Sequence, residues 1–237
     1  LRVEAKSYSS PAAMPWLVGA GVYLLLLALG ARLLNDPDSY WHVAVGNWIA
    51  QHGAVPTTDP FSFTMRGAPW IAFEWLSELA YAAAFAISGW AGVVILAAAA
   101  IALAFGLLTR LLLRELTPVP ALVLILAALV LAASQMLARP HVLVLPIMVA
   151  WAGAMVRAMD QRSPPPYAAL PLLVLWANLH GSVVLGLGLI GPAILEALLR
   201  EERRSAWPRI VLQWIPFAAL AVVASCLTPY GPGSLLV

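Results

Sequence analysis

Charged side chains and cysteines are scarce in this chain of 237 residues. Only 10% of the residues are charged, the formal net charge is +2, and Cys226 is the single cysteine. One cysteine excludes a disulfide framework or a cysteine metal site within the chain. A net charge this small gives no indication of nucleic acid as a partner. The composition therefore disfavours a disulfide-stabilised domain and a nucleic-acid-binding protein.

Motifs of nucleotide and hydrolytic chemistry are also missing. The sequence has no phosphate-binding glycine-rich loop, no Ser/His/Asp arrangement with recognisable spacing, and no His-x-x-x-His metal pair. Without a nucleotide motif, a cytosolic enzyme that uses a nucleotide sugar or ATP is disfavoured.

Apolar residues make up 62% of the chain, and the mean hydropathy is +0.89. A transmembrane helix needs about 20 apolar residues, and most of the ten tryptophans suit the membrane interfaces. We therefore predict an all-α polytopic membrane protein, a single module over 1–237 that contacts the lipid bilayer. We expect about seven transmembrane helices, near 14–34, 91–113, 118–138, 142–156, 167–179, 182–199 and 210–227.

The chain begins at Leu1, so we expect it to start inside a longer natural sequence. Arg2 and Lys6 precede an apolar run that is too long for the core of a signal peptide, and we therefore expect no cleavable signal.

One long hydrophilic stretch, 34–75, interrupts the apolar runs, and we expect it to belong to an outward-facing loop over 35–90 that carries two juxtamembrane helices. Asp36 suits a helix cap, Pro37 the first helical position and Gly53 the stop, which predicts an amphipathic surface helix between them. A second helix is expected over 72–88. Its polar side chains recur at helical spacing, so we expect a juxtamembrane helix and not a span. They are Glu74, Ser77, Glu78 and Tyr81.

The basic residues support this topology, because cytoplasmic loops carry an excess of Lys and Arg. If 72–88 does not cross, ten of the thirteen basic residues lie on the cytoplasmic side, and only Arg32, Arg66 and Arg139 lie outside. The ends of the spans at 35–38, 138–141, 178–181 and 228–231 then converge on one face, which predicts a site there. The ten cytoplasmic residues are Arg2, Lys6, Arg110, Arg114, Arg157, Arg162, Arg200, Arg203, Arg204 and Arg209.

Asp36 and Asp38 are the first candidates for catalysis. Two carboxylates two residues apart suit a general base with an orienting group, or a shared divalent cation such as Mg²⁺ or Mn²⁺. The competing interpretation is a helix cap followed by a charge favourable to the helix dipole. The spacing alone leaves both interpretations, and the metal dependence, open.

Other polar residues are candidates for substrate binding. Arg139, with His141 beside it, suits a phosphate, because the planar guanidinium makes charge-assisted bonds to phosphate oxygens; the alternative is a helix-end Arg that reaches lipid headgroups. His180, beside Asn178, suits a polar ligand or simply a neighbouring carbonyl. Asp59 and Glu74 are also candidates, and their alternatives are a turn former before Pro60 and an acid in the first turn of a helix. His42 is a further candidate for substrate binding.

Several short motifs occur together along the chain. They are Asp36-Pro37-Asp38-Ser39-Tyr40-Trp41-His42, Asp59-Pro60-Phe61-Ser62, Glu74-Trp75-Leu76, Arg139-Pro140-His141, Asn178-Leu179-His180-Gly181 and Pro229-Tyr230-Gly231.

With the first span, the acidic loop, two juxtamembrane helices and six further spans, this pattern resembles the GT-C superfamily of membrane glycosyltransferases, in a largely uncharacterised bacterial branch. The resemblance implies a polyprenyl-phosphate sugar donor and an active site on the periplasmic face of the bacterial inner membrane. It also implies that Asp36 or Asp38 is the base or a metal ligand. Such enzymes carry further spans or a soluble domain after this module, and we expect that portion to lie outside the sequence, which ends at Val237.

Two functions follow. In the first, a glycosyltransferase, Asp38 or Asp36 deprotonates the periplasmic or lipid-linked acceptor, while Arg139, assisted by His141 or His180, stabilises the departing polyprenyl phosphate. In the second, the chain is a non-catalytic GT-C-like subunit that packs with other membrane subunits. The small residues of 93–106, which permit close helix contacts, motivate the second function. A transporter is disfavoured, because few ionisable groups lie in mid-membrane.

Overall fold

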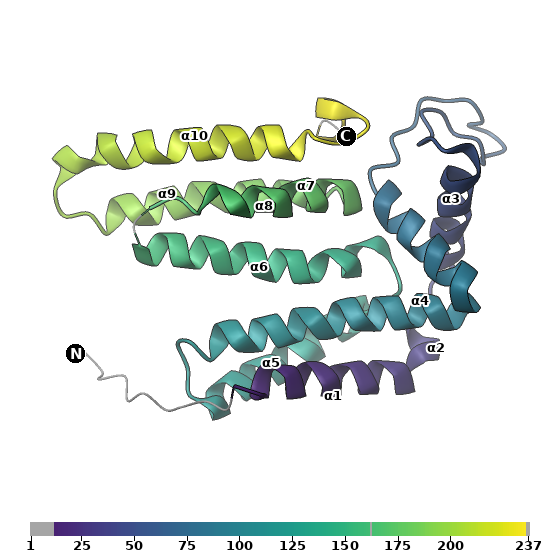
Figure 1. Ribbon diagram of the computed structural model, residues 1–237, viewed down its shortest axis with the longest axis horizontal. Coiled ribbons are helices and arrows are strands. Elements are labelled where there is room, and N and C mark those ends of the chain that lie inside the picture. The colour runs from purple at the N-terminus through teal and green to yellow at the C-terminus, as the bar shows by residue number, and fades with distance from the viewer. Residues whose placement is uncertain (1–11, 162, 236–237) are drawn as a thin grey trace.

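The computed structural model describes residues 12–161 and 163–235, and within these ranges the chain forms helices and loops but no strand. Figure 1 shows a bundle of roughly parallel helices with two inclined segments across one end. The α-helices are α1 (Met14–Ala28), α2 (Gly30–Leu33), α3 (Asp38–His52), α4 (Trp75–Leu112), α5 (Pro118–Ala132), α6 (Pro140–Gln161), α7 (Leu170–Leu179), α8 (Val183–Gly188), α9 (Ile190–Leu199) and α10 (Trp207–Ser225).

Among the described residues, four helical segments are long and apolar enough to cross a membrane, which supports the prediction of an all-α membrane protein. They are Trp75–Leu112, Pro118–Gln135, Pro140–Gln161 and Arg204–Ser225. The other expected spans correspond to shorter apolar helices, namely Met14–Ala28, Tyr167–Leu179 and Val183–Leu199. A count of seven spans therefore stays a prediction.

The first inclined segment is α3, and its ends follow from local sequence. The helix begins at Asp38, one residue later than expected, and the Asp36 carboxylate accepts the backbone N–H of Asp38 at 2.9 Å. It ends at Gly53, whose φ of 62° lies in the left-handed region that glycine adopts without strain.

The second inclined segment is the start of α4, which bends where the predicted surface helix ends. Ser88 (φ −150°) and Gly89 (φ 61°) have non-helical backbone angles, so α4 consists of a part before the kink and a part after it. The first part packs beside α3 at one end of the bundle, and the second runs along the other helices (Figure 1). The helix starts at Trp75, later than predicted, and its place at a membrane surface stays a prediction.

The core has two apolar clusters that meet at α6. One involves α1, α3, α4 and α5, and the other lies among α6 to α10. Trp151, Trp176 and Trp214 are at most 1% exposed and belong to the second cluster. The expectation that most tryptophans anchor the interfaces is wrong for these three, because they fill the space between helices.

The predicted convergence of four segments at one end of the bundle is confirmed. Nη1 of Arg139 lies 3.3 Å from Oδ2 of Asp36, and the ring centroids of His141 and His180 lie 6.4 Å apart. The Asn178 amide donates to the Leu227 carbonyl at 2.9 Å, next to the fourth segment. Arg110 and Arg157 lie near the C-terminal ends of α4 and α6, away from this end of the bundle. Three basic residues used in the topology prediction lie outside the described residues: Arg2, Lys6 and Arg162.

Candidate functional site

A polar pocket of about 640 Å³ opens where α3, the start of α4, the start of α6 and the end of α7 meet. Six of the nine site residues predicted from the sequence line it, and the other three do not. Its lining residues are Asp38, Trp41, His42, Glu74, Gln135, Arg139, Pro140, His141 and His180.

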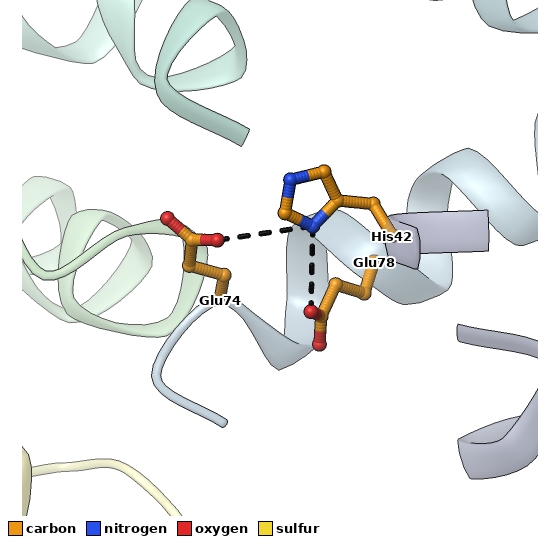
Figure 2. Close-up of side chains that lie close together, drawn as sticks. All are labelled: His42, Glu74 and Glu78. Atoms are coloured by element: carbon orange, nitrogen blue, oxygen red, sulfur yellow. Dashed lines mark hydrogen bonds and ion pairs between the residues drawn. The ribbon is translucent and has the colours of Figure 1, made fainter. Parts of the chain in front are cut away.

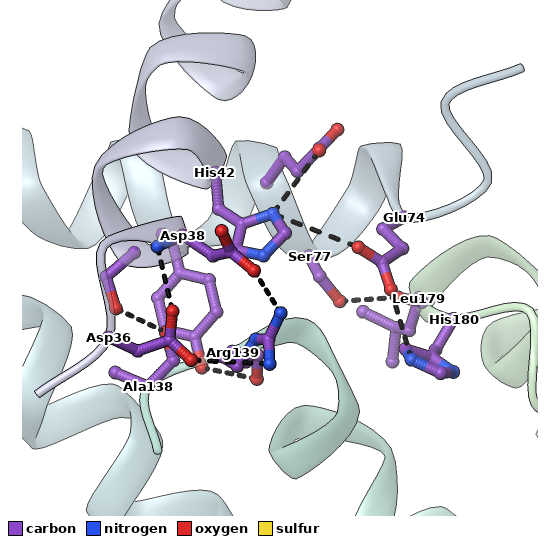
Figure 3. A network of polar contacts seen from close by, with 12 residues as sticks. Asp36, Asp38, His42, Glu74, Ser77, Ala138, Arg139, Leu179 and His180 are labelled. Atoms are coloured by element: carbon purple, nitrogen blue, oxygen red, sulfur yellow. Dashed lines mark hydrogen bonds and ion pairs between the residues drawn. The ribbon is translucent and has the colours of Figure 1, made fainter. Parts of the chain in front are cut away.

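Arg139 binds both predicted aspartates (Figure 3). Its Nη2 donates to Oδ2 of Asp38, and its Nη1 lies 3.3 Å from Oδ2 of Asp36. The Asp36 side chain is only 14% exposed and uses its other oxygen to accept the Asp38 N–H, whereas the Asp38 side chain is 49% exposed. The guanidinium supplies the positive charge that a cation between these aspartates would supply.

Backbone contacts hold this group in place. The Tyr81 hydroxyl donates to the Arg139 carbonyl at 3.0 Å, and the Ser39 hydroxyl donates to the Ala138 carbonyl at 3.2 Å. The Ser77 hydroxyl donates to the Leu179 carbonyl at 2.8 Å, which ties α4 to the end of α7 (Figure 3). Side chains of α3 and α4 thus position the turns that carry Arg139 and His180.

A second charged group lies beside the first. In Figure 2 the His42 imidazole lies between two carboxylates, with Nδ1 at 3.5 Å from Oε1 of Glu78 and at 3.8 Å from Oε2 of Glu74. One ligand atom from each residue lies within 4.8 Å of the others. Glu78 belongs to the predicted polar stripe, and its spacing of four residues from Glu74 already indicated that both carboxylates face the same side of the helix.

The remaining histidines have defined hydrogen bonds. Nδ1 of His180 accepts the Ser182 backbone N–H at 2.9 Å, so the neutral ring carries its proton on Nε2 and donates it to Oε1 of Glu74 at 3.1 Å. Nε2 of His141 lies 2.8 Å from the Gln135 carbonyl, which makes it a donor. The rings of His141 and His180 lie edge to face with centroids 6.4 Å apart, and both residues line the pocket.

The structure does not bring Asn178 into the pocket lining. Its side-chain oxygen accepts the Trp75 indole N–H at 2.9 Å, and its amide donates to the carbonyls of Val174 and Leu227 at 2.7 and 2.9 Å. Asn178 thus connects α7 with α4 and with the end of α10, and these contacts place it behind the pocket.

Asp59 also lies outside the pocket lining. Its Oδ1 accepts the backbone N–H groups of Phe61 and Ser62 at 2.8 and 3.0 Å. Hydrogen bonds from the side chain and backbone of Ser62, and from Phe61, lower the pKa of the Asp59 carboxyl below its ordinary value. These contacts agree with the turn-forming interpretation of Asp59.

Comparison of the chain with protein-family models, curated proteins and solved structures gives no match. The resemblance to the GT-C superfamily therefore stays a prediction, and any functional proposal depends on the geometry of the site.

Proposed function

We propose that the chain is a membrane glycosyltransferase that moves a sugar from a polyprenyl phosphate to a periplasmic or lipid-linked acceptor. The observation that carries this proposal is the Arg139 guanidinium at a pocket of about 640 Å³, within the usual range of ligand sites, at one end of an apolar helical bundle. In the proposed complex, the phosphate group of the lipid lies among the polar groups of the pocket, and its polyprenyl chain lies along the apolar bundle.

Arg139 is the residue that suits the leaving group. As the bond between sugar and phosphate breaks, negative charge accumulates on the phosphate, and a positioned guanidinium stabilises that charge with paired hydrogen bonds. The Arg139 side chain is 37% exposed and is already held in one orientation by Asp36 and Asp38. It therefore loses little conformational freedom when the phosphate binds.

Asp38 suits the role of general base better than Asp36 does. Asp36 uses one oxygen for the Arg139 guanidinium and the other for a backbone N–H. Asp38 contacts Arg139 through Oδ2 only and lines the pocket. In the proposed reaction Asp38 takes the acceptor's hydroxyl proton while that oxygen attacks the anomeric carbon, and the bond from this carbon to the phosphate oxygen breaks.

The walls of the pocket suit a sugar. Trp41 is 37% exposed, lines the pocket, and packs edge to face against Phe61 at 4.9 Å, with Trp70 at 5.8 Å. An aromatic face of this kind accommodates the apolar side of a sugar ring. His141 also lines the pocket, and because its Nε2 donates to the Gln135 carbonyl, its Nδ1 suits a hydrogen bond accepted from a sugar hydroxyl.

The proposed orientation places the pocket on the periplasmic side of a bacterial inner membrane. It is supported by Arg110, Arg114 and Arg157, which line a smaller pocket of about 240 Å³ on the second part of α4 and on α6. Basic residues concentrate on the cytoplasmic side of membrane proteins.

The alternative function is a non-catalytic GT-C-like subunit of a larger membrane complex. The small residues of 93–106 motivated it, but much of this surface is used within the chain: Ala97, Ala98 and Ile101 are 0% exposed, and Gly106 packs against the backbone of α1 at Pro15 and Gly19. Within the described part of the chain, we find no contact or surface that specifically favours this alternative.

Binding of polyprenyl phosphate to the purified chain in detergent tests the proposal, with the uncharged polyprenol as control ligand. We expect the phosphate to bind more tightly than the alcohol. Arg139→Met should weaken its binding by more than 10-fold and up to about 150-fold, because a charge-assisted hydrogen bond contributes about 1.5–3 kcal/mol. Equal binding of the phosphate and the alcohol contradicts the proposal.

Transfer from a panel of polyprenyl-phosphate sugars in proteoliposomes then tests the division of roles. Asp38→Asn should bind polyprenyl phosphate but transfer sugar at least about 100-fold more slowly, the lower range for a general base. Full transfer by Asp38→Asn excludes that residue as the base.

A further inference from the structure

We propose that His42, Glu74 and Glu78 form a binding site for one divalent transition-metal ion with zinc-like ligand preferences. The proposal rests on the geometry of these three side chains and not on the reaction proposed above, and it differs from the sequence-based prediction of a cation between Asp36 and Asp38.

The spacing of the three groups matches ligands better than hydrogen-bond partners. Good hydrogen bonds to nitrogen span about 2.7–3.2 Å, whereas His42 Nδ1 lies 3.5 Å from Glu78 Oε1 and 3.8 Å from Glu74 Oε2. Around an ion with bonds of about 2.0–2.1 Å, tetrahedral ligand atoms lie about 3.3–3.4 Å apart. An ion between the three atoms, which all lie within 4.8 Å of one another, thus requires the two carboxylates to close on it by side-chain movement (Figure 2).

Burial gives an independent reason to expect a cation. The side chains of His42 and Glu78 are 7% and 3% exposed, and that of Glu74 is 20% exposed. Oε2 of Glu78 is fully buried and has no hydrogen-bond partner in the described part of the chain. Burying two carboxylates around one imidazole is costly unless positive charge compensates them, and a divalent ion supplies that charge while satisfying the Glu78 carboxylate.

The fold builds this cluster through one close helix crossing. A Cβ on Gly46 would overlap the Glu78 carbonyl oxygen, so only glycine lets α3 approach α4 this closely. His42 lies one turn before Gly46 and therefore faces Glu78 and Glu74, which lie one turn apart at the start of α4.

A neighbouring imidazole orients one of the ligands. Nε2 of His180 donates to Oε1 of Glu74 at 3.1 Å and leaves Oε2 facing His42. Metal-binding carboxylates are commonly held by such outer hydrogen bonds. His42 and Glu74 also line the large pocket, so a further coordination position opens toward it for water or a ligand oxygen.

The donor set selects the ion. Imidazole nitrogen suits Zn²⁺ and related transition metals, whereas Mg²⁺ prefers oxygen ligands throughout. The competing interpretation is a His42 imidazolium held between two carboxylates without a metal, and that arrangement binds no Zn²⁺.

Zinc titration of the full chain distinguishes these interpretations. The protein is purified in detergent with a histidine-free tag, stripped with chelator, and titrated with Zn²⁺ or Mg²⁺ by calorimetry, with metal content measured after desalting. We expect one Zn²⁺ per chain, and weaker Mg²⁺ binding. His42→Gln and Glu78→Gln should weaken Zn²⁺ binding at least 10-fold, and His180→Gln about 10-fold, the lower range for an outer hydrogen bond.

His52→Gln is the matched control, because His52 is exposed on the last turn of the same helix, where its ring accompanies Trp48 through a hydrogen bond and a stacking contact. X-ray absorption of the zinc-loaded unmutated chain identifies the ligands without any variant, and we expect one imidazole with oxygen ligands. Absence of stoichiometric Zn²⁺, two or more imidazoles around the ion, or equal loss in His52→Gln overturns the proposal.

Discussion

The Tyr81 hydroxyl donates a hydrogen bond to the backbone carbonyl of Arg139 at 3.0 Å, which joins the part of α4 before the kink to the start of α6. Tyr81 is 1% exposed, so no water replaces this donor when it is removed. We expect Tyr81→Phe to lower the free energy of unfolding by about 1 kcal/mol and to weaken the binding of polyprenyl phosphate at Arg139. Thermal unfolding in detergent, with Tyr40→Phe as an exposed control, measures the first effect.

Arg139 contacts two carboxylates that diverge from one guanidinium, and this geometry requires arginine. Lysine keeps the charge but cannot reproduce the planar fork. We expect Arg139→Lys to bind polyprenyl phosphate about 10-fold more weakly, a loss of about 1.4 kcal/mol. Arg66→Lys, in an exposed loop, is the matched control and should bind like the unmutated chain. Equal affinity of Arg139→Lys and the unmutated chain would show that charge alone is sufficient.

Gly46 marks the crossing of α3 and α4. A Cβ there would overlap the Glu78 carbonyl oxygen and lie 2.7 Å from the Ala82 Cβ, so Gly46→Ala forces the helices apart. We expect a loss of about 1–3 kcal/mol in unfolding free energy, the usual cost of overpacking, with weaker Zn²⁺ binding. Gly21→Ala, with no atom within 4 Å of its Cβ, should have little effect in the same unfolding and titration measurements. Similar losses in both variants would contradict this account.

The orientation of the chain can be tested with a membrane-impermeant thiol reagent. In a Cys226→Ser background, Thr58→Cys tests the loop between α3 and α4, and Ser205→Cys tests the arginine-rich end; both positions are exposed. In spheroplasts we expect labelling of Thr58→Cys, and labelling of Ser205→Cys only after the membrane is permeabilised. The reverse labelling pattern would show that the pocket faces the cytoplasmic side of the membrane.

The turn at Asp59 should depend on pH only in acid. The hydrogen bonds from Ser62 and Phe61 favour the carboxylate, so the folded-state pKa lies below the unfolded value of about 3.9. This contribution to stability is therefore complete above the unfolded pKa and is lost as the pH falls through the folded pKa. We expect the Phe61 amide proton shift, followed by NMR, to titrate with a midpoint below about 3.9 and to stay constant between pH 5 and 8. A midpoint above 3.9 would contradict the hydrogen-bonded turn.

Local features of the fold were predictable because their signals are local. Gly53 ends α3, and the polar helix predicted to stop at Ser88 does so at a kink. The convergence of distant segments was also predictable, because apolar length and the placement of basic residues restrict how the chain can cross a membrane.

The contacts within the site could not be read from the sequence. The bond from Arg139 to Asp38 joins residues 101 positions apart, and it depends on how α3 and α6 meet. Glu78 reaches His42 only because Gly46 permits a close crossing, which no periodic pattern reveals. For Asp59 the sequence offered a functional and a turn-forming interpretation, and its local bonds to Phe61 and Ser62 favour the second. Asn178 is taken out of the pocket lining by tertiary contacts with Trp75 and Leu227, which the sequence does not reveal.

The kink at Ser88 and Gly89 has a mechanical consequence. The short arm of α4 carries Glu74 and Glu78, while the long arm packs with α1 and α6. Hydrogen bonds from Ser77 and Tyr81 hold the short arm against the turns at Leu179 and Arg139, so the angle of the kink fixes where Glu74 and Glu78 stand beside the pocket. Gly89 lies outside the pocket lining, yet its left-handed backbone angle sets the direction of the arm that carries both carboxylates.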